Sequence, residues 1–448
     1  MRENFLEIKE KIRDFNKKIS VDGDKSISIR WALLASQGIG VSTAENLLKS
    51  EDVLNTLKCL RKLGIKIHFK KNKCQIFGQG LNGFFFKKNI ILDAGNSGTL
   101  GRLILPLLIK SPYKIKLIGD KSLSKRDFSR IIEPLKEIGA NFYPKNNRKL
   151  PLIIKGSEFL RPIKYFEKRG SAQCKSSVLL ASLLTPGQME IVAKKSRNHT
   201  EIMFQNLKIP IKIRTKNNKD YISVFRPNTI KNINIKIPGD ISSSAFFIVL
   251  TLLSKKSKLV IKNVNINTSR LGIIKILNKM GGKIKLLNKK KNNNEECADI
   301  LIKSQKKLKK INCPTNLNSS AIDEFLLIFL VAAKSKGIST FTNLAELNQK
   351  ESPRLKIASK ILKMMGVKVV SDNNSIKIYG NPKLKINKKI QIKNYMKDHR
   401  VFMMSVIAAM SIGGNWKIYD PDSVETSFPS FIKIIKNLGG KFNWKLKK

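Results

Sequence analysis

The sequence predicts a mixed α/β protein with two lobes, each made of three similar units. In a recurring phrase, an apolar-periodic helix ends at Leu, Ile or Met followed by Gly, and an alternating strand follows. A glycine there suits the left-handed residue that closes a helix. The five copies are LRKLGIKIHF, LKEIGANFYP, LNKMGGKIKL, LKMMGVKVVS and IKNLGGKFNW, with Gly64, Gly139, Gly281, Gly366 and Gly439.

A sixth, weaker copy, LKIPIKI, is interpreted as having Pro210 in place of the glycine. The six positions are separated by 75, 71, 71, 85 and 73 residues, so units of similar size cover the chain. The longest gap contains Asn288–Glu296 (NKKKNNNEE), whose low complexity predicts a surface loop or insertion. Each unit is expected to alternate strands and helices, with two strands flanking the Gly turn. The chain is expected to cross between the lobes near Pro238-Gly239-Asp240.

Hydropathy and cysteine usage exclude several classes of protein. The longest apolar runs, such as Phe325–Ala333 and Ala245–Leu253, are about half as long as the roughly 20 residues of a membrane span. The charged N-terminus lacks the apolar core of a signal peptide. The five cysteines form no CxxC pair and are odd in number, which suits a reducing cytoplasm and buried, inert thiols.

The net charge of +55, from 87 basic and 32 acidic residues, is the most extreme bulk property. A charge of this size can indicate binding to nucleic acid or a membrane surface. The lysines are spread along the whole chain, Ile and Asn are also abundant, and no nucleic-acid-binding motif accompanies them. We therefore interpret the charge mainly as a compositional bias. A positive field would still favour the capture of small anionic substrates.

Basic residues repeatedly stand where apolar helices are expected to begin. In GDKSISIR, which precedes WALLAS, Ser26 and Arg30 are four residues apart and share a helix face. The glycine-rich DAGNSGTLGR likewise precedes LILPLLI. Exposed N–H groups and the helix dipole make such starts anion sites, although one alone is an ordinary capped helix. Seven cations at these starts suggest one shared anionic ligand: Lys25, Arg30, Arg102, Arg197, Lys350, Arg354 and Arg400.

Other motifs lack the context that their chemistry requires. Gly78–Gly83 (GQGLNG) matches the dinucleotide-binding pattern, but FFFKK follows it instead of a helix, so it is interpreted as a turn. His68, His199 and His399 form no HExxH or HxxxH pair. They are expected to be hydrogen-bonding or surface residues, and no metal site is predicted.

Nine motifs occur in the order found in the EPSP synthase (3-phosphoshikimate 1-carboxyvinyltransferase) family, which makes the resemblance highly specific. Two of them, GSAQCKS and SRNHTE, resemble the branch that includes the glyphosate-insensitive bacterial enzymes. The nine are GDKSISIR, GNSGTLGR, GDKSLSKR, GSAQCKS, SRNHTE, PGDISSSAF, IDEF, ELNQKESPR and DHR, and the resemblance extends from about Gly23 to Phe428-Pro429.

The resemblance implies the inside-out barrel of the enolpyruvyl transferases, in which each lobe has three βαβαββ units. Residues 1–21 and 240–448 would form one lobe and residues 22–239 the other, with the active site in the cleft between them. It also implies transfer of the enolpyruvyl group of phosphoenolpyruvate to the 5-hydroxyl of shikimate 3-phosphate, with release of phosphate, on the shikimate pathway to chorismate and the aromatic amino acids. No metal or organic cofactor is implied.

The motif positions also imply the site residues. Shikimate 3-phosphate is expected to contact Lys25, Ser26, Arg30, Ser171, Ala172, Gln173, Ser196, Asp323 and Lys350. Phosphoenolpyruvate is expected to contact Lys25, Gly98, Arg126, Gln173, Arg354 and Arg400.

The implied reaction needs cations for two multiply charged anions, and it needs proton transfers. Asp323 is the candidate base for the 5-hydroxyl. Glu351 and Lys25 are the candidates for proton transfer at the methylene carbon, and the motifs leave open how the acid and base roles are divided.

Some positions depart from the family pattern. Pro353 replaces Asp next to Arg354 and could tilt that side chain, and Thr426 stands where some members have a lysine that contacts phosphoenolpyruvate. Gly98 stands where the insensitive enzymes have Ala, so the resemblance implies inhibition by glyphosate.

Two other functions would share some of these sequence features. The sister transferase that acts on UDP-N-acetylglucosamine has a catalytic Cys on a mobile loop, but the corresponding segment, Gly119–Arg130, contains none. The other rival is a basic nucleic-acid-binding protein with a degenerate enzyme fold. The preferred interpretation predicts a cytoplasmic monomer with small anionic substrates and with neither nucleic acid nor membrane as partner.

Overall fold

The computed structural model describes residues 4–70, 72–144, 148–168 and 170–446. The chain divides into two compact units. Where the chain passes from one unit to the other, the boundaries differ by one or two residues from those expected above. The outer ends of the expected ranges lie outside the described residues. Unit 1 contains Met1–Asp22, Pro238–Lys290 and Glu296–Lys448, and unit 2 contains Gly23–Ile237 and Lys291–Glu295.

Unit 2 has three sheets, whose strand orders are β14-β3-β5-β4, β6-β7-β9-β8 and β10-β11-β13-β12. The strands are β3 (Ile39–Glu45), β4 (Lys66–Lys70), β5 (Lys73–Gln79), β6 (Ile91–Asp93), β7 (Ile115–Ile118), β8 (Asn141–Tyr143), β9 (Leu152–Lys155), β10 (Lys164–Glu167), β11 (Gln188–Lys194), β12 (Ile211–Lys216), β13 (Lys219–Phe225) and β14 (Asn234–Lys236). The helices are α1 (Lys25–Gln37), α2 (Glu51–Lys62), α3 (Gly98–Leu103), η1 (Leu105–Leu108), η2 (Leu123–Lys125), α4 (Ser129–Ile138), α5 (Ala172–Ala181) and α6 (His199–Asn206).

Unit 1 also has three sheets, ordered β21-β22-β1-β23, β16-β17-β15-β2 and β18-β20-β19. The strands are β1 (Asn4–Ile8), β2 (Asn16–Ile19), β15 (Lys258–Asn265), β16 (Lys283–Asn292), β17 (Glu295–Lys303), β18 (Gly337–Phe341), β19 (Val369–Ser371), β20 (Ile376–Gly380), β21 (Lys389–Ile392), β22 (Asn415–Tyr419) and β23 (Asn443–Leu446). The helices are α7 (Ile241–Leu253), η3 (Thr268–Arg270), α8 (Gly272–Lys279), η4 (Thr315–Leu317), α9 (Asn318–Ala321), α10 (Phe325–Lys334), η5 (Ala345–Gln349), α11 (Arg354–Met364), α12 (His399–Ile412), η6 (Pro421–Thr426) and α13 (Phe431–Asn437).

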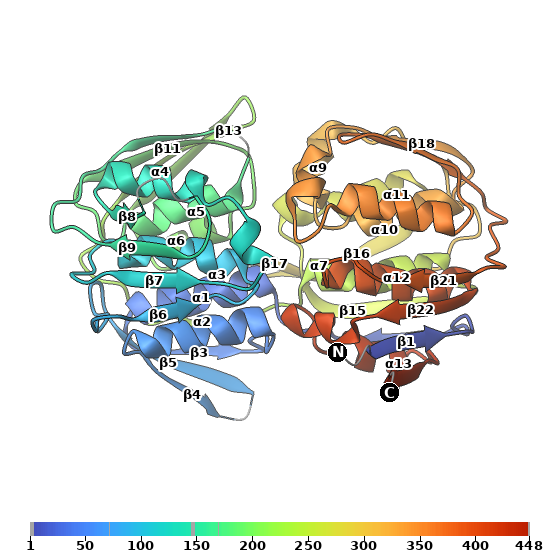
Figure 1. Cartoon of the computed structure of the whole chain (residues 1–448), viewed down its shortest axis with the longest axis horizontal. Helices are drawn as coiled ribbons and strands as arrows, with labels where there is room; N and C mark the ends of the chain where they lie inside the picture. The colour runs from blue at the N-terminus through green and yellow to red at the C-terminus, as the bar shows by residue number, and fades with distance from the viewer. Residues whose placement is uncertain (1–3, 71, 145–147, 169, 447–448) are drawn as a thin grey trace. The chain divides into compact units, whose positions relative to one another are not determined.

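The expected βαβαββ repeat is confirmed. The order β6-α3-β7-α4-β8-β9 recurs as β10-α5-β11-α6-β12-β13, and in both sheets the first two strands are parallel and the others antiparallel. Two repeats exchange their first strands: β2 pairs in parallel with β15, and β14 pairs in parallel with β3. The chain leaves unit 1 after β2 and returns to it after β14 (Figure 1).

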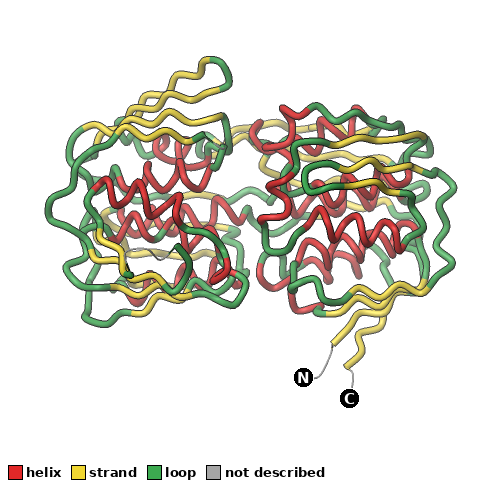
Figure 2. Tube along the Cα trace, turned by 45° about the horizontal axis from the view of Figure 1, so that its top comes forward, coloured by secondary structure: helices red, strands yellow, loops and turns green. Residues whose placement is uncertain are grey.

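Within each unit the helices lie inside and the sheets outside (Figure 2). The inner helices are buried on every side: every residue of α7 from Ile241 to Leu252 is buried, as is every residue of α10 from Phe325 to Ala333. A helix that is apolar all round is stable only where it is enclosed. The apolar runs of the sequence are therefore core helices, and no helix in the described ranges is long and apolar enough to span a membrane.

The predicted glycines close their helices as expected. Gly64, Gly139, Gly281, Gly366 and Gly439 all have positive φ. In the sixth copy the interpretation of Pro210 was wrong, because the left-handed residue is Lys208, with φ 55°, directly after the end of α6. An L-residue in this conformation costs roughly 1–2 kcal/mol, so this helix end is strained.

The prediction for the low-complexity segment Asn288–Glu296 was right about its exposure and wrong about its backbone. Most of the segment is exposed, but it is a hairpin and not a loop: it contains the end of β16, a turn at the left-handed Asn293 and Asn294, and the start of β17. Its tip belongs to unit 2, where the Asn292 side chain donates to the carbonyl of Lys236 at 2.5 Å.

The prediction of buried thiols is confirmed, because all five cysteines are free and buried. Burial is the main cause that raises the pKa of the Cys59 and Cys74 thiols to about 12.

A matched pair of substitutions tests the helix-closing residues. Nothing lies within 4 Å of a Cβ added to Gly366, so Gly366→Ala should cost about 1 kcal/mol through the backbone alone. Lys208→Gly should instead stabilise the protein, by up to about 1 kcal/mol, because it removes the strain. Urea-unfolding midpoints measure both effects, and a stabilising Gly366→Ala would contradict this account.

Candidate functional site

In unit 2, the side chain of Arg30 on α1 forms hydrogen bonds with two other helices, α5 and α6, near their N-terminal ends. From α1, its Nε donates to Thr200 Oγ1 on α6 at 2.8 Å, and its Nη2 donates to Ser176 Oγ on α5 at 3.1 Å. Its Nη1 donates to the carbonyl of Ser26, four residues earlier, which confirms the shared helix face. Arg30 is buried, so these neutral partners hold its guanidinium in one place.

The start of α3 is connected to α5 through Gln173. Arg102 Nη1 donates to Gln173 Oε1 at 3.0 Å, and Gln173 Nε2 donates to Thr99 Oγ1 at 3.0 Å. Ser97 caps α3 by accepting from the amide of Leu100 at 3.2 Å. The glycine-rich turn and the GSAQ segment therefore meet at two helix N-termini, which carry partial positive charge.

Gly98 lies directly against two arginines. A Cβ added there would lie 2.8 Å from Arg102 Nη1 and 2.9 Å from Arg126 Nη1. Arg126 Nη2 also donates to Asn96 Oδ1 at 3.3 Å. The absence of a side chain at position 98 is thus what allows the two guanidinium groups to lie where they do.

The other predicted residues of unit 2 lie at helix starts. Lys25 opens α1 and pairs with Asp52 on α2 at 2.8 Å. Ser171 caps α5, whose first residue is Ala172, by accepting from the amide of Cys174 at 3.3 Å. Ser196 precedes α6, and its buried hydroxyl has no hydrogen-bond partner among the described residues.

In unit 1, all five predicted residues come together around Asp323. One carboxylate oxygen, Oδ1, lies 3.6 Å from Arg354 Nη1 and 3.9 Å from Lys350 Nζ. The other, Oδ2, lies 4.0 Å from Arg400 Nη2, while Arg400 Nη1 donates to the Asp323 carbonyl at 2.9 Å. Glu351 completes the group through its ion pair with Arg354.

Arg354 is the most deeply buried of these cations, with 1% of its surface exposed. Asp398 holds it bidentately, accepting from Nε at 2.9 Å and from Nη2 at 3.2 Å. Burial alone would lower the pKa of Arg354, but the carboxylates of Asp398 and Glu351 raise it above its ordinary value. Burial alone would raise the pKa of Asp398, but Arg354 outweighs burial and lowers it. Both groups therefore stay charged, and Pro353 does not prevent this pairing.

The sequence analysis did not predict a set of residues that connect Arg400 to a buried polar network. Glu324 Oε1 lies 3.7 Å from Arg400 Nη1 and accepts from Ser242 Oγ at 2.5 Å. Arg270 Nη2 donates to Ser242 Oγ at 2.8 Å and to Asp240 Oδ1 at 3.0 Å. This buried network ties Arg400 to the start of α7. Glu324 and Asp240 belong to recognised motifs, whereas nothing in the sequence around Arg270 marks it.

The histidines behave as predicted. His199 Nδ1 lies 2.6 Å from Glu295 Oε1, His399 Nδ1 lies 3.3 Å from Thr426 Oγ1, and His68 is exposed. Within the described ranges, no group of three or more His, Cys, Asp or Glu residues could hold a metal ion.

The family model of EPSP synthase (3-phosphoshikimate 1-carboxyvinyltransferase) matches residues 9–435. The chain belongs to the EPSP synthase family. The 3-phosphoshikimate 1-carboxyvinyltransferase of Ruthia magnifica subsp. Calyptogena magnifica is 39% identical over 427 residues, which are 95% of this chain and 96% of that protein. The resemblance inferred from nine motifs is therefore confirmed.

Solved structures confirm the fold class. EPSP synthase from Acinetobacter baumannii superposes with a TM-score of 0.86 at 32% identity, covering 99% of this chain and all of that one. The enolpyruvyl transferase NikO from Streptomyces tendae has a TM-score of 0.78 at 12% identity, with both chains fully covered. At that identity the similarity concerns the fold alone.

Asp398→Asn should destabilise the protein by about 3–5 kcal/mol, because it leaves Arg354 buried without its bidentate partner. The pKa of Asp398 is lowered by folding, so its contribution is present above the unfolded value of about 3.9 and is lost as pH falls through the folded value. Thermal unfolding measured from pH 7 down to acid should therefore show a loss of stability in the native protein that is absent in the variant.

Asp372→Asn is the control for this prediction, because Asp372 is an exposed acid of the same unit. A loss of stability in the control as large as that in Asp398→Asn would contradict the role given to the buried pair.

Proposed function

We propose that this chain transfers the 1-carboxyvinyl group of phosphoenolpyruvate to the 5-hydroxyl of shikimate 3-phosphate, with release of phosphate. The observation that carries the proposal is the cluster in unit 1, where Asp323 lies within 4.0 Å of Lys350, Arg354 and Arg400. The two substrates in this proposal are those expected for the family to which the chain belongs. A carboxylate that accepts a proton, surrounded by cations that hold anions, is what addition of a hydroxyl to phosphoenolpyruvate requires.

Shikimate 3-phosphate is assigned nine residues. Support comes from the buried, unpartnered hydroxyl of Ser196 and from the fixed guanidinium of Arg30. A rigid cation binds an anion without first losing side-chain entropy. The assigned residues are Lys25, Ser26, Arg30, Ser171, Ala172, Gln173, Ser196, Asp323 and Lys350.

Phosphoenolpyruvate is assigned six residues. The forks of Arg126, Arg354 and Arg400 suit the planar carboxylate and the phosphate, because guanidinium groups can bind both bidentately. The contacts of Gly98 with Arg126 and of Arg400 with Glu324 support these positions. The assigned residues are Lys25, Gly98, Arg126, Gln173, Arg354 and Arg400.

The chemical steps follow from these assignments. Asp323 takes the proton of the 5-hydroxyl while the hydroxyl oxygen attacks C2 of phosphoenolpyruvate. The methylene carbon of phosphoenolpyruvate gains a proton in the same step. The resulting tetrahedral intermediate then loses phosphate, and loss of a methyl proton restores the double bond. Glu351 and Lys25 are the candidates for proton transfer at that carbon.

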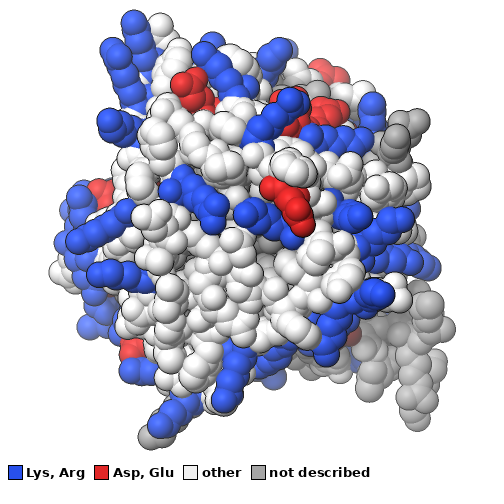
Figure 3. All heavy atoms as spheres, turned by 90° about the vertical axis from the view of Figure 1, so that its left-hand side faces the viewer, with Lys and Arg blue, Asp and Glu red and all other residues white. Residues whose placement is uncertain are grey.

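We further infer a cytoplasmic monomer that acts on small molecules. The buried thiols suit a reducing compartment. On one face of unit 2, basic side chains are scattered over the edge and the middle, with fewer acidic ones among them and an uncharged area below the middle (Figure 3). This is the distribution expected of a compositional bias and not of a nucleic-acid site. Light scattering at several protein concentrations tests the monomer.

Asp323→Asn should lower kcat by about 10²–10⁴-fold while the protein stays folded, because it removes the proposed base and keeps the side-chain shape. Phosphate release from shikimate 3-phosphate plus phosphoenolpyruvate measures this. Glu346→Gln is the matched control, since Glu346 also pairs with Lys350, at 3.2 Å, but is exposed.

Near-normal turnover in Asp323→Asn would remove this residue from the mechanism. Turnover by the native protein with UDP-N-acetylglucosamine, and none with shikimate 3-phosphate, would overturn the proposed function itself.

Gly98→Ala should raise the KM for phosphoenolpyruvate by about tenfold, which is 1.4 kcal/mol, because the added methyl group displaces Arg102 and Arg126. The clashing atoms are the ends of flexible side chains, so the melting temperature should change little. Glyphosate should inhibit the native protein in competition with phosphoenolpyruvate and inhibit the variant less. Native activity unchanged at millimolar glyphosate would refute this.

A further inference from the structure

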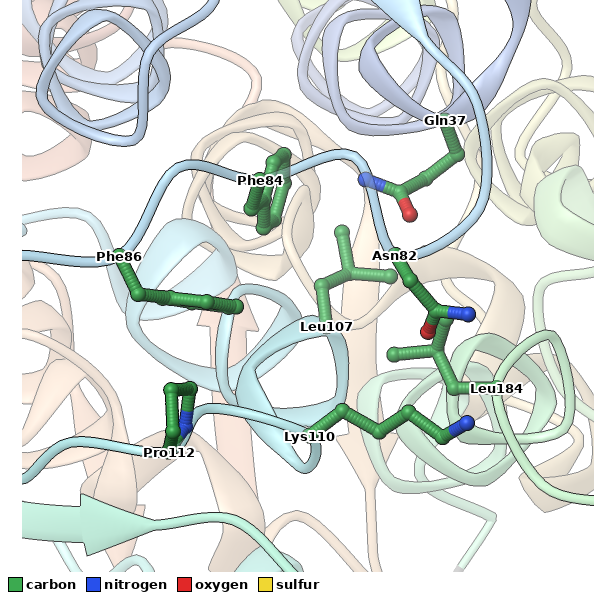
Figure 4. A pocket seen from close by; sticks show the side chains of 8 residues that line it. All are labelled: Gln37, Asn82, Phe84, Phe86, Leu107, Lys110, Pro112 and Leu184. Carbon is green, nitrogen blue, oxygen red and sulfur yellow. The ribbon is translucent and has the colours of Figure 1, made fainter. Parts of the chain in front are cut away.

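Unit 2 contains a pocket of about 390 Å³ that includes none of the residues assigned to the two substrates (Figure 4). Its volume lies in the range of about 300–1,000 Å³ that is usual for small-molecule sites. The residues of its wall that matter here are Gln37, Phe84, Phe86, Lys110, Pro112 and Leu184.

The pocket lies away from the N-terminus of α1, where the predicted site residues stand. Gln37 is the last residue of this helix and Lys25 is the first, so the two are separated by about 18 Å along the axis. The pocket wall also uses the loop after β5. The glycine motif Gly78–Gly83 begins at the end of β5 and continues into that loop, where three phenylalanines follow it, and the proposed reaction does not use this segment.

One side of the pocket is apolar and aromatic. Phe84, Phe86 and Pro112 lie along it in Figure 4. The rings of Phe84 and Phe86 have centroids 6.2 Å apart and an interplanar angle of 85°. Edge-to-face pairs of this kind accept a further ring in the same geometry. The shape and chemistry of this side therefore suit a flat apolar ring.

The other side carries the side-chain amide of a buried residue, Gln37. Gln37 is 1% exposed, and its Nε2 donates to Ser36 Oγ at 3.2 Å. Figure 4 shows the side-chain amide of Gln37 turned into the pocket. Its carbonyl oxygen can accept a hydrogen bond from a ligand that occupies this space.

Lys110 supplies a positive charge on the same side. Its side chain extends toward Asn82 and Leu184 in Figure 4. Burial, and secondarily the guanidinium of Arg226, lowers the pKa of its ammonium group. Among the described residues, no carboxylate pairs with Lys110. A half-buried cation beside a second cation favours an anionic ligand.

We propose that this pocket is a binding site for a small aromatic carboxylate that also carries a hydroxyl or amino donor. The ring packs against Phe84 and Phe86, the carboxylate pairs with Lys110, and the donor bonds to the carbonyl oxygen of Gln37. This site is separate from the one proposed for the reaction and does not depend on what the reaction is.

The test is titration of the full-length protein with 3-(4-hydroxyphenyl)propionate by calorimetry, at physiological salt because the net charge attracts any anion at low salt. Saturable binding at one site per chain is expected. Three compounds each lack part of the probe: 4-propylphenol lacks the carboxylate, 3-phenylpropionate lacks the donor, and hexanoate lacks both the ring and the donor. Each should bind more weakly than the full probe.

Three variants locate the binding. Lys110→Gln should weaken binding of the probe by about tenfold or more, as expected for loss of a partly desolvated charge pair. Phe86→Leu, which keeps an apolar side chain, should weaken it by about threefold through loss of the ring contact. Lys116→Gln is the control, because it removes the same charge from an exposed position on β7 and should leave binding unchanged.

Any of four results would overturn the proposal. These are no saturable binding to the native protein, equal weakening by Lys116→Gln and Lys110→Gln, an unchanged affinity in Lys110→Gln, or hexanoate binding as tightly as the aromatic probe. The last result would indicate an alkyl-chain site. Thermal unfolding of each variant shows whether the fold is intact, and Lys110→Glu, which repels the carboxylate, provides a second substitution at the same position.

Discussion

The structure depends on carboxylates that hold like-charged side chains close together. Lys350, Arg354 and Arg400 all lie within 4.0 Å of the same carboxylate, that of Asp323. Cations at this spacing repel one another strongly where water is excluded. Carboxylates behind them offset the repulsion, chiefly Asp398 at Arg354 and Glu324 at Arg400. The carboxylates thus fix the orientation of these cations, and charged groups fixed in this way need little reorganisation to stabilise an anion.

The fold was predictable to the extent that it depends on local backbone geometry. The five glycines marked the helix ends because only glycine adopts a positive φ without strain. The helix end of the sixth repeat was predicted two residues too late. Lys208 adopts the positive φ that glycine adopts in the other repeats, and a lysine does not indicate this conformation in the sequence. The segment Asn288–Glu296 was misread for a related reason. Composition alone does not show that its asparagines form a tight turn between two long strands.

The site was predictable where a motif fixes both a residue and its position on a helix. The five predicted residues of unit 1 meet around Asp323, and Arg30 and Gln173 connect helix starts in unit 2. The residues that support them were not predictable, because their partners are distant in sequence. Arg270 contacts Asp240, 30 residues earlier, and Ser242 contacts Glu324, 82 residues later. Such pairings depend on how the helices pack, which no local pattern specifies.

The strand β1 has a consequence for biosynthesis. Its neighbours β22 and β23 are synthesised more than 400 residues after it, which at about 5–20 residues per second takes roughly 20–80 s. Unit 2, in contrast, is almost entirely one continuous stretch and can fold during translation. The apolar side chains of Phe5, Leu6 and Ile8 must meanwhile remain uncovered. A nascent chain of this design is therefore a natural client for chaperones that shield an exposed strand.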